Sequence, residues 1–189
     1  CMKCGKRVRQ EEEYCSSCRE IPHNFSRGRC LLPYEGKTRK SIYRFKYGKR
    51  QEYAKAYAQL MAEEMGDFIR SCGADALLPV PLHARRQQKR GYNQATLLAK
   101  ALGSICGIPV CSHLIRRTKN TIPQKKLTFS QRQNNLKRAF KFTRNDVKLN
   151  TIIIIDDIYT TGSTIDAIAR LCQEKGIENV YFLTIAGGK

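Results

Sequence analysis

Hydrophobic and polar positions alternate along the chain in a way that predicts an α/β fold. Short apolar runs typical of buried strands lie at residues 29–34, 76–80, 138–142, 152–155 and 179–186. Apolar residues recur at helical spacing over residues 38–47, 51–71, 93–102, 130–136 and 163–175. Because strands and helices alternate, we predict a parallel sheet with helices on both faces.

The run Ile152–Ile155 is the centre of this pattern, since four β-branched residues in a row are typical of a doubly buried strand. Asp156 and Asp157 follow it, and the small, hydroxyl-rich segment Thr160–Thr164 then leads into a helix. Unpaired N–H groups at a helix start can cradle a phosphate, and Gly162 permits close approach. The carboxylates would repel that phosphate and suit vicinal hydroxyls or Mg²⁺. The combination indicates a ribose 5-phosphate site; a plain strand feeding a capped helix is the alternative.

The segment 151–166 resembles the signature of the type I phosphoribosyltransferases, which bind 5-phosphoribosyl 1-pyrophosphate (PRPP). The resemblance implies that Asp156 and Asp157 are catalytic residues that hold the ribose hydroxyls, with Mg²⁺ accompanying PRPP. It implies a phosphoribosyl-binding set of Ile158, Tyr159, Thr160, Thr161, Gly162, Ser163 and Thr164. In that family the loop after the strand at 76–80 contacts pyrophosphate, although its usual small residues are missing here. The corresponding residues are Val80, Pro81, Leu82 and His83, followed by Arg85, Arg90 and Asn93.

Residues 79–95, PVPLHARRQQKRGYNQA, extend the likeness beyond that signature. Together with Arg117, Gln124, Arg132 and Phe140 they resemble the competence protein F (ComF) family, phosphoribosyltransferase-like proteins of DNA uptake in natural transformation. The resemblance implies a Rossmann-like type I phosphoribosyltransferase fold over residues 29–189. It also implies a flexible hood at 118–130, single-stranded DNA as a partner, and a helicase-like partner in the uptake machinery.

Two CxxC pairs open the chain and contain Cys1, Cys4, Cys15 and Cys18. Four thiolates at this spacing can converge tetrahedrally on one Zn²⁺. A redox CxxC usually occurs singly, and disulfides are disfavoured in a cytosolic chain. We therefore predict a structural zinc ribbon and linker at residues 1–28. The other cysteines are expected in the core: Cys30, Cys72, Cys106, Cys111 and Cys172.

Positive charge is concentrated in one part of the chain. The formal net charge is +19, and residues 76–145 contain no Asp or Glu but fifteen Lys and Arg. Such a concentration of positive charge indicates a polyanionic partner. The alternative explanation is that the excess charge only keeps the protein soluble. Aromatic residues interleaved with cations near residue 40 offer stacking surfaces for nucleic acid, or else belong to the core. They are Tyr34, Tyr43, Phe45 and Tyr47.

No apolar run approaches the roughly 20 residues that cross a bilayer, and no signal-peptide pattern is present. We therefore expect a cytoplasmic protein without membrane insertion. Because the sequence starts at Cys1 rather than Met, we expect it to begin inside a longer reading frame.

The leading hypothesis is a ComF-type protein that binds Mg²⁺–PRPP and handles single-stranded DNA during DNA uptake. Two alternatives stay open. One is an active phosphoribosyltransferase, a glycosyltransferase that transfers ribose 5-phosphate to an unidentified nucleobase or amine and releases pyrophosphate. The other is a PRPP-sensing regulator that binds nucleic acid. Whether the protein is an enzyme is left open, because the sequence presents neither a general base nor a base-recognition loop.

Overall fold

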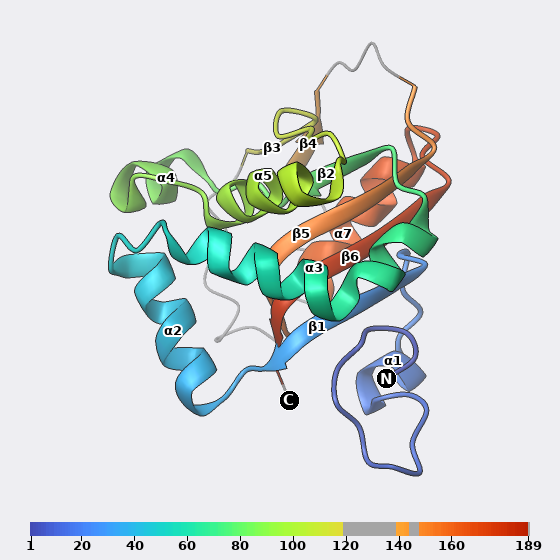
Figure 1. Cartoon of the computed structure of the whole chain (residues 1–189). Helices are drawn as coiled ribbons and strands as arrows, with labels where there is room; N and C mark the ends of the chain where they lie inside the picture. The colour runs from blue at the N-terminus through green and yellow to red at the C-terminus, as the bar shows by residue number, and fades with distance from the viewer. Residues whose placement is uncertain (119–138, 144–147, 189) are drawn as a thin grey trace.

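The computed structural model describes residues 1–118, 139–143 and 148–188 (Figure 1). The helix predicted at 130–136 and nearly all of the hood predicted at 118–130 lie outside these residues.

A parallel sheet organises the described part of the chain. Its strand order is β1 (Arg27–Pro33), β6 (Asn179–Gly187), β5 (Thr151–Tyr159) and β2 (Ala76–Pro79), and every neighbouring pair is parallel. The run Ile152–Ile155 lies in β5 between two neighbouring strands, and its side chains are fully buried. The predicted α/β fold with a parallel sheet is therefore confirmed.

Helices cover both faces of this sheet (Figure 1). On one face lie α3 (Tyr53–Cys72) and α5 (Gln94–Cys106), and on the other lies α7 (Ser163–Gln173). A hydrophobic core lies on each face of the sheet, and successive isoleucines of β5 pack into opposite cores because side chains alternate along a strand. Ile153 packs in the α3/α5 core, whereas Ile154 packs in the core that includes residues of α7. Helix α3 lies where the apolar spacing predicted a helix at residues 51–71; its Met61 side chain is fully buried, whereas Leu60 is 43% exposed.

Two helices and a pair of short strands also lie outside the sheet. The basic helix α2 (Gly36–Tyr47) follows β1, and the short helix α4 (Ala84–Arg90) follows β2. The strands β3 (Ile115–Arg117) and β4 (Phe140–Phe142) form a separate antiparallel pair. The sequence pattern predicted α2 and the strand at 138–142, but it predicted a loop where α4 lies.

The first 26 residues, all of which the structure describes, contain turns and the short helix α1 (Ser16–Glu20), and no strand. They pack beside β1 (Figure 1): the Gly28 N–H donates a hydrogen bond to the Lys3 carbonyl, 2.8 Å. Because β1 already begins at Arg27, the boundary predicted between 28 and 29 falls inside a strand; the two-domain division stays a prediction. Among the described residues, no helix is both long enough and apolar enough to cross a bilayer.

Candidate phosphoribosyl and metal sites

The predicted acid pair lies within the final part of β5, because this strand continues to Tyr159 rather than ending at the carboxylates. The Asp157 N–H donates a hydrogen bond to Asp156 Oδ1, 2.8 Å, which brings the two acids together. Burial and the neighbouring Asp157 carboxylate raise the pKa of Asp156 to about 7. Two carboxylates crowded at the end of a buried strand call for a compensating cation.

Lys46 of α2 supplies part of that compensation, and the sequence analysis did not single it out. Its Nζ lies 2.9 Å from Asp157 Oδ2, and both side chains are largely buried. Burial lowers the pKa of Lys46, but the Asp157 carboxylate outweighs burial and raises it overall. Lys46 is therefore charged and fixed beside the acid pair.

The loop after β5 has the geometry of a phosphate cradle. Gly162 has φ +78°, and a Cβ atom there would lie 2.5 Å from the Tyr159 hydroxyl, so only glycine fits. Helix α7 begins directly afterwards at Ser163, whose Oγ lies 2.9 Å from Thr161 Oγ1. One pocket brings Asp156 and this loop together. It is lined by Asp156, Ile158, Tyr159, Thr160, Gly162, Ser163, Thr164 and Ile165.

The Tyr159 hydroxyl is a buried polar atom beside Gly162 of this loop. Tyr159 is 1% exposed, and its hydroxyl finds no hydrogen-bond partner among the described residues. Its ring is held rigidly, stacked on Phe182 with centroids 4.7 Å apart. A buried hydroxyl without a partner costs free energy, so an acceptor atom of a bound ligand would stabilise it.

The predicted pyrophosphate loop lies next to the acid pair. The Val80 N–H donates to the carbonyl of Ile155, 2.9 Å, the residue directly before Asp156. Asn93 Nδ2 donates to the Val80 carbonyl, 3.0 Å, while Asn93 Oδ1 caps α5. His83 caps α4 in the same way, accepting from the Arg85 N–H. Pro81 and Leu82 complete the loop and are half-buried.

Basic residues of α4 and β3 lie near this edge of the sheet. Arg90 of α4 donates to Gln94 Oε1, 2.9 Å, and to the Tyr47 hydroxyl, 3.0 Å. Arg117 of β3 is half-buried, and burial and the nearby Arg86 guanidinium lower its pKa, although the Asp156 carboxylate opposes this. Arg117 therefore lies within electrostatic reach of Asp156, while the predicted ligand Arg85 is exposed.

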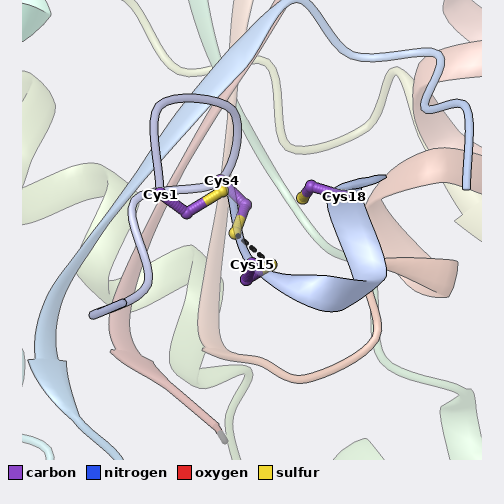
Figure 2. Close-up of side chains that lie close together, drawn as sticks. All are labelled: Cys1, Cys4, Cys15 and Cys18. Atoms are coloured by element: carbon purple, nitrogen blue, oxygen red, sulfur yellow. Dashed lines mark hydrogen bonds between the residues drawn. The ribbon is translucent and has the colours of Figure 1, made fainter. Parts of the chain in front are cut away.

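The four N-terminal cysteines converge as predicted (Figure 2). Their sulfur atoms all lie within 4.8 Å of one another, and Cys4 Sγ is 3.7 Å from Cys15 Sγ. Thiolates about 2.3 Å from a tetrahedral zinc lie about 3.8 Å apart, so the donor set fits this ion. None of the nine cysteines, all within the described residues, forms a disulfide. Of the five expected in the core, Cys72 and Cys172 are buried and the others are half-buried.

Comparisons with known proteins identify the family of the chain. No protein-family model matches the chain. Competence protein F of Haemophilus influenzae is 30% identical to it, over 98% of this chain and 83% of the relative. The chain belongs to the competence protein F family. It is also similar to the DNA utilization protein YhgH of Salmonella typhimurium, 32% identical over 95% of this chain and 80% of that protein. Competence protein ComFC of Bacillus subtilis is 39% identical over 53% of this chain and 39% of its own length.

Proposed function

We propose that this member of the competence protein F family acts in DNA utilisation and competence, and that it does so by binding Mg²⁺–PRPP and single-stranded DNA. The observation that carries the proposal is the pocket that unites Asp156 with the glycine loop and the start of α7. A phosphate cradle beside a carboxylate pair matches a 5-phosphate beside a ribose diol. The names of the relatives support the role in DNA utilisation.

Each part of the site has a defined task in this proposal. The carboxylates of Asp156 and Asp157 accept hydrogen bonds from the ribose hydroxyls, and the N–H groups of residues 160–164 donate to the 5-phosphate. The diphosphate lies over the Val80–His83 loop, where Arg90 of α4 and Arg117 of β3 balance its charge. Mg²⁺ would screen the diphosphate from the acid pair, because carboxylate and phosphate oxygens are the ligands that it prefers.

The exposed face of α2 supports the nucleic-acid part of the proposal. Tyr43 and Tyr47 are 64% and 54% exposed, and their ring centroids lie 5.0 Å apart. Phe45, by contrast, is fully buried, and Tyr34 is half-buried, so neither offers a free stacking face. The cations exposed on the same helix are Lys37, Arg39, Lys40 and Arg44. Two exposed rings among cations suit unstacked bases and their phosphates.

A transferase reaction is the second candidate, and a second pocket beside the same loop favours it. The pocket is lined by residues at the ends of β1 and β6, among them Tyr34, Glu35 and Gly188, together with Lys6 and Arg7. The Gly188 N–H donates to the Tyr159 carbonyl, 2.7 Å, which places this pocket next to the phosphoribosyl loop. An amine bound there would form a bond to the ribose C1 as the bond to pyrophosphate breaks. Release of pyrophosphate in a screen of nucleobases and amines tests this candidate.

Calorimetric titration of Mg²⁺–PRPP into the protein tests the proposed site. The wild type should bind, and Asp156→Asn combined with Asp157→Asn should weaken binding about tenfold or more, since each lost charged acceptor weakens the complex. Asp67→Asn on the exposed face of α3 is the matched control and should bind as the wild type does. Equal affinity in the double variant would refute the ribose assignment.

Repeating the titration with single-stranded DNA present separates the remaining alternatives. A PRPP-sensing regulator requires that each ligand change the affinity of the other. Independent binding would exclude the regulator and leave DNA handling and catalysis. The helicase-like partner and the cytoplasmic location stay predictions.

A further inference from the structure

The four-cysteine segment, residues 1–21, is docked against the sheet by close backbone contacts. Gly5 has φ +72°, and a Cβ atom there would lie 2.6 Å from Arg29 Cα. Cys30 of β1 donates from its thiol to the Cys4 carbonyl, 3.4 Å. Any side chain at Gly5 would push the segment off β1, so the placement of the residues that follow depends on this contact.

Lys6, directly after Gly5, extends from this segment to the phosphoribosyl loop. Lys6 is only 7% exposed, and its Nζ donates to the carbonyl of Thr160, 3.4 Å. The same Nζ lies 5.8 Å from the centre of the Tyr159 ring. Its stem packs over Gly187, where a Cβ atom would lie 2.9 Å from Lys6 Cγ. The ammonium group is thus brought to the start of the loop by residues from three parts of the chain.

The charge of Lys6 has no carboxylate partner within ion-pair distance among the described residues. One long hydrogen bond to a carbonyl and a distant ring compensate a buried ammonium poorly. Two anions can complete the compensation. One is the zinc-loaded thiolate cluster, whose four thiolates outweigh the charge of Zn²⁺. The other is a phosphate group in the adjacent loop.

We propose that Lys6 is the cationic residue of the 5-phosphate site and that the zinc-loaded four-cysteine segment holds it there, so that zinc binding and phosphate-ester binding favour each other. This inference rests on the proposed phosphoribosyl function. Tyr159 supports it independently: the residue lines the same pocket, and its buried hydroxyl, beside Gly162, has no hydrogen-bond partner among the described residues. Lysine suits this position, since its flexible stem lets the ammonium move from the Thr160 carbonyl to a phosphate oxygen.

Ribose 5-phosphate is the probe for the first experiment, because it contains the phosphate ester without the diphosphate. Lys6→Met keeps the apolar stem and should lower the affinity measured by calorimetry about tenfold to a hundredfold, the usual effect of losing a charge-assisted hydrogen bond. The matched control is Lys55→Met, which makes the same change at an exposed lysine of α3, outside both pockets, and should change affinity less than about twofold. Metal analysis of each variant should give one zinc per chain.

Zinc removal provides the second measurement. Stripping zinc from the wild type with a chelator should lower the affinity for ribose 5-phosphate, and the same treatment of the Lys6→Met variant should lower it much less. Such non-additivity is expected only if zinc acts through Lys6. By reciprocity, saturating ribose 5-phosphate should slow the loss of zinc to the chelator in the wild type and not in the variant.

The outcomes separate this inference from the function on which it rests. If the wild type binds neither ribose 5-phosphate nor PRPP, the phosphoribosyl function itself fails. If the wild type binds and zinc-loaded Lys6→Met binds equally well, only the role of Lys6 is overturned. If Lys6→Met loses zinc while its remaining zinc-loaded fraction keeps full affinity, Lys6 serves only as a counter-ion of the thiolates, and the inference is likewise overturned.

Discussion

Lys46 and Asp157 form a largely buried ion pair, with Nζ 2.9 Å from Oδ2, that joins helix α2 to the end of strand β5. The side chains of Tyr43 and Tyr47 are exposed on the same helix. One helix therefore contacts the candidate ribose site with one residue and presents a cationic aromatic surface with others. This arrangement gives a direct physical route by which a ligand at the acid pair can influence the outer surface of α2.

The Lys46–Asp157 pair should contribute measurably to stability. In a double-mutant cycle of Lys46→Met and Asp157→Asn, we expect a coupling free energy of about 1–3 kcal/mol in urea unfolding, because removing one partner leaves a buried charge. The exposed pair Arg50–Glu52 is the control, and its cycle should give about 0.5 kcal/mol or less. Coupling energies of similar size for both pairs would contradict the buried arrangement.

Two aspartates associated with β5 should respond to pH in opposite ways. At the start of the strand, the N–H groups of Thr151 and Asn150 donate to Asp75 and lower its pKa. At its end, burial and Asp157 raise the pKa of Asp156 from 3.8 to about 7. Ionisation thus stabilises the fold through Asp75 and destabilises it through Asp156.

The test of this contrast is the free energy of unfolding measured between pH 3 and pH 8. Asp156→Asn should gain stability relative to the wild type as the pH rises from about 4 to about 7, reaching about 4 kcal/mol, since each unit of pKa difference corresponds to about 1.4 kcal/mol. Asp75→Asn should be less stable at neutral pH, and its deficit should shrink as the pH falls below 3.8. Curves that run parallel to the wild type at all pH values would show that neither carboxylate has the environment described.

The α2 surface should bind single-stranded DNA through its rings. Tyr43→Ala with Tyr47→Ala should lower the affinity about tenfold or more, since stacking contributes about 1–3 kcal/mol per base. The dependence of affinity on salt should stay unchanged, because every cation is retained. Tyr14→Ala, an exposed tyrosine in the four-cysteine segment, is the control. An unchanged affinity, or a loss equal to that of the control, would place DNA binding elsewhere.

Local patterns in the sequence were enough to predict the central strand and the four-cysteine cluster. Ile152–Ile155 form a continuous β-branched run, and the CxxC spacing already fixes which sulfurs can meet. The strand itself extends past its apolar part to Tyr159, because backbone pairing with β6 continues there. Hydrophobicity could not show this. Helix α4 was missed for a related reason: it contains no apolar stripe, and only its helix-forming residues and the His83 cap signal it.

The two lysines of the candidate site that the sequence did not reveal make contacts between distant parts of the chain. Lys6 and Thr160 are 154 positions apart, and Lys46 reaches Asp157 across most of the fold. Neither lysine lies in a motif. Each has other basic residues close to it in the sequence, so the sequence does not indicate which of them contacts the site. Hydrophobic periodicity and motif spacing predict which residues share a face of one helix or strand. The contacts of Lys6 with Thr160 and of Lys46 with Asp157 depend instead on how distant elements pack together.

The pairing of β1 with β6 has a consequence for how the protein acquires its structure during synthesis. β1 lies near the start of the chain, and in the described sheet its hydrogen-bonding neighbour is β6, close to the end. A nascent chain therefore leaves the ribosome with β1 unpaired, and α3 and α5 have no complete sheet to cover until β5 and β6 emerge. Folding should be late, slow and governed by long-range contacts. Before β5 and β6 emerge, the four-cysteine segment can already bind a metal ion through the thiols of Cys1, Cys4, Cys15 and Cys18. This segment would therefore fold before the sheet is complete.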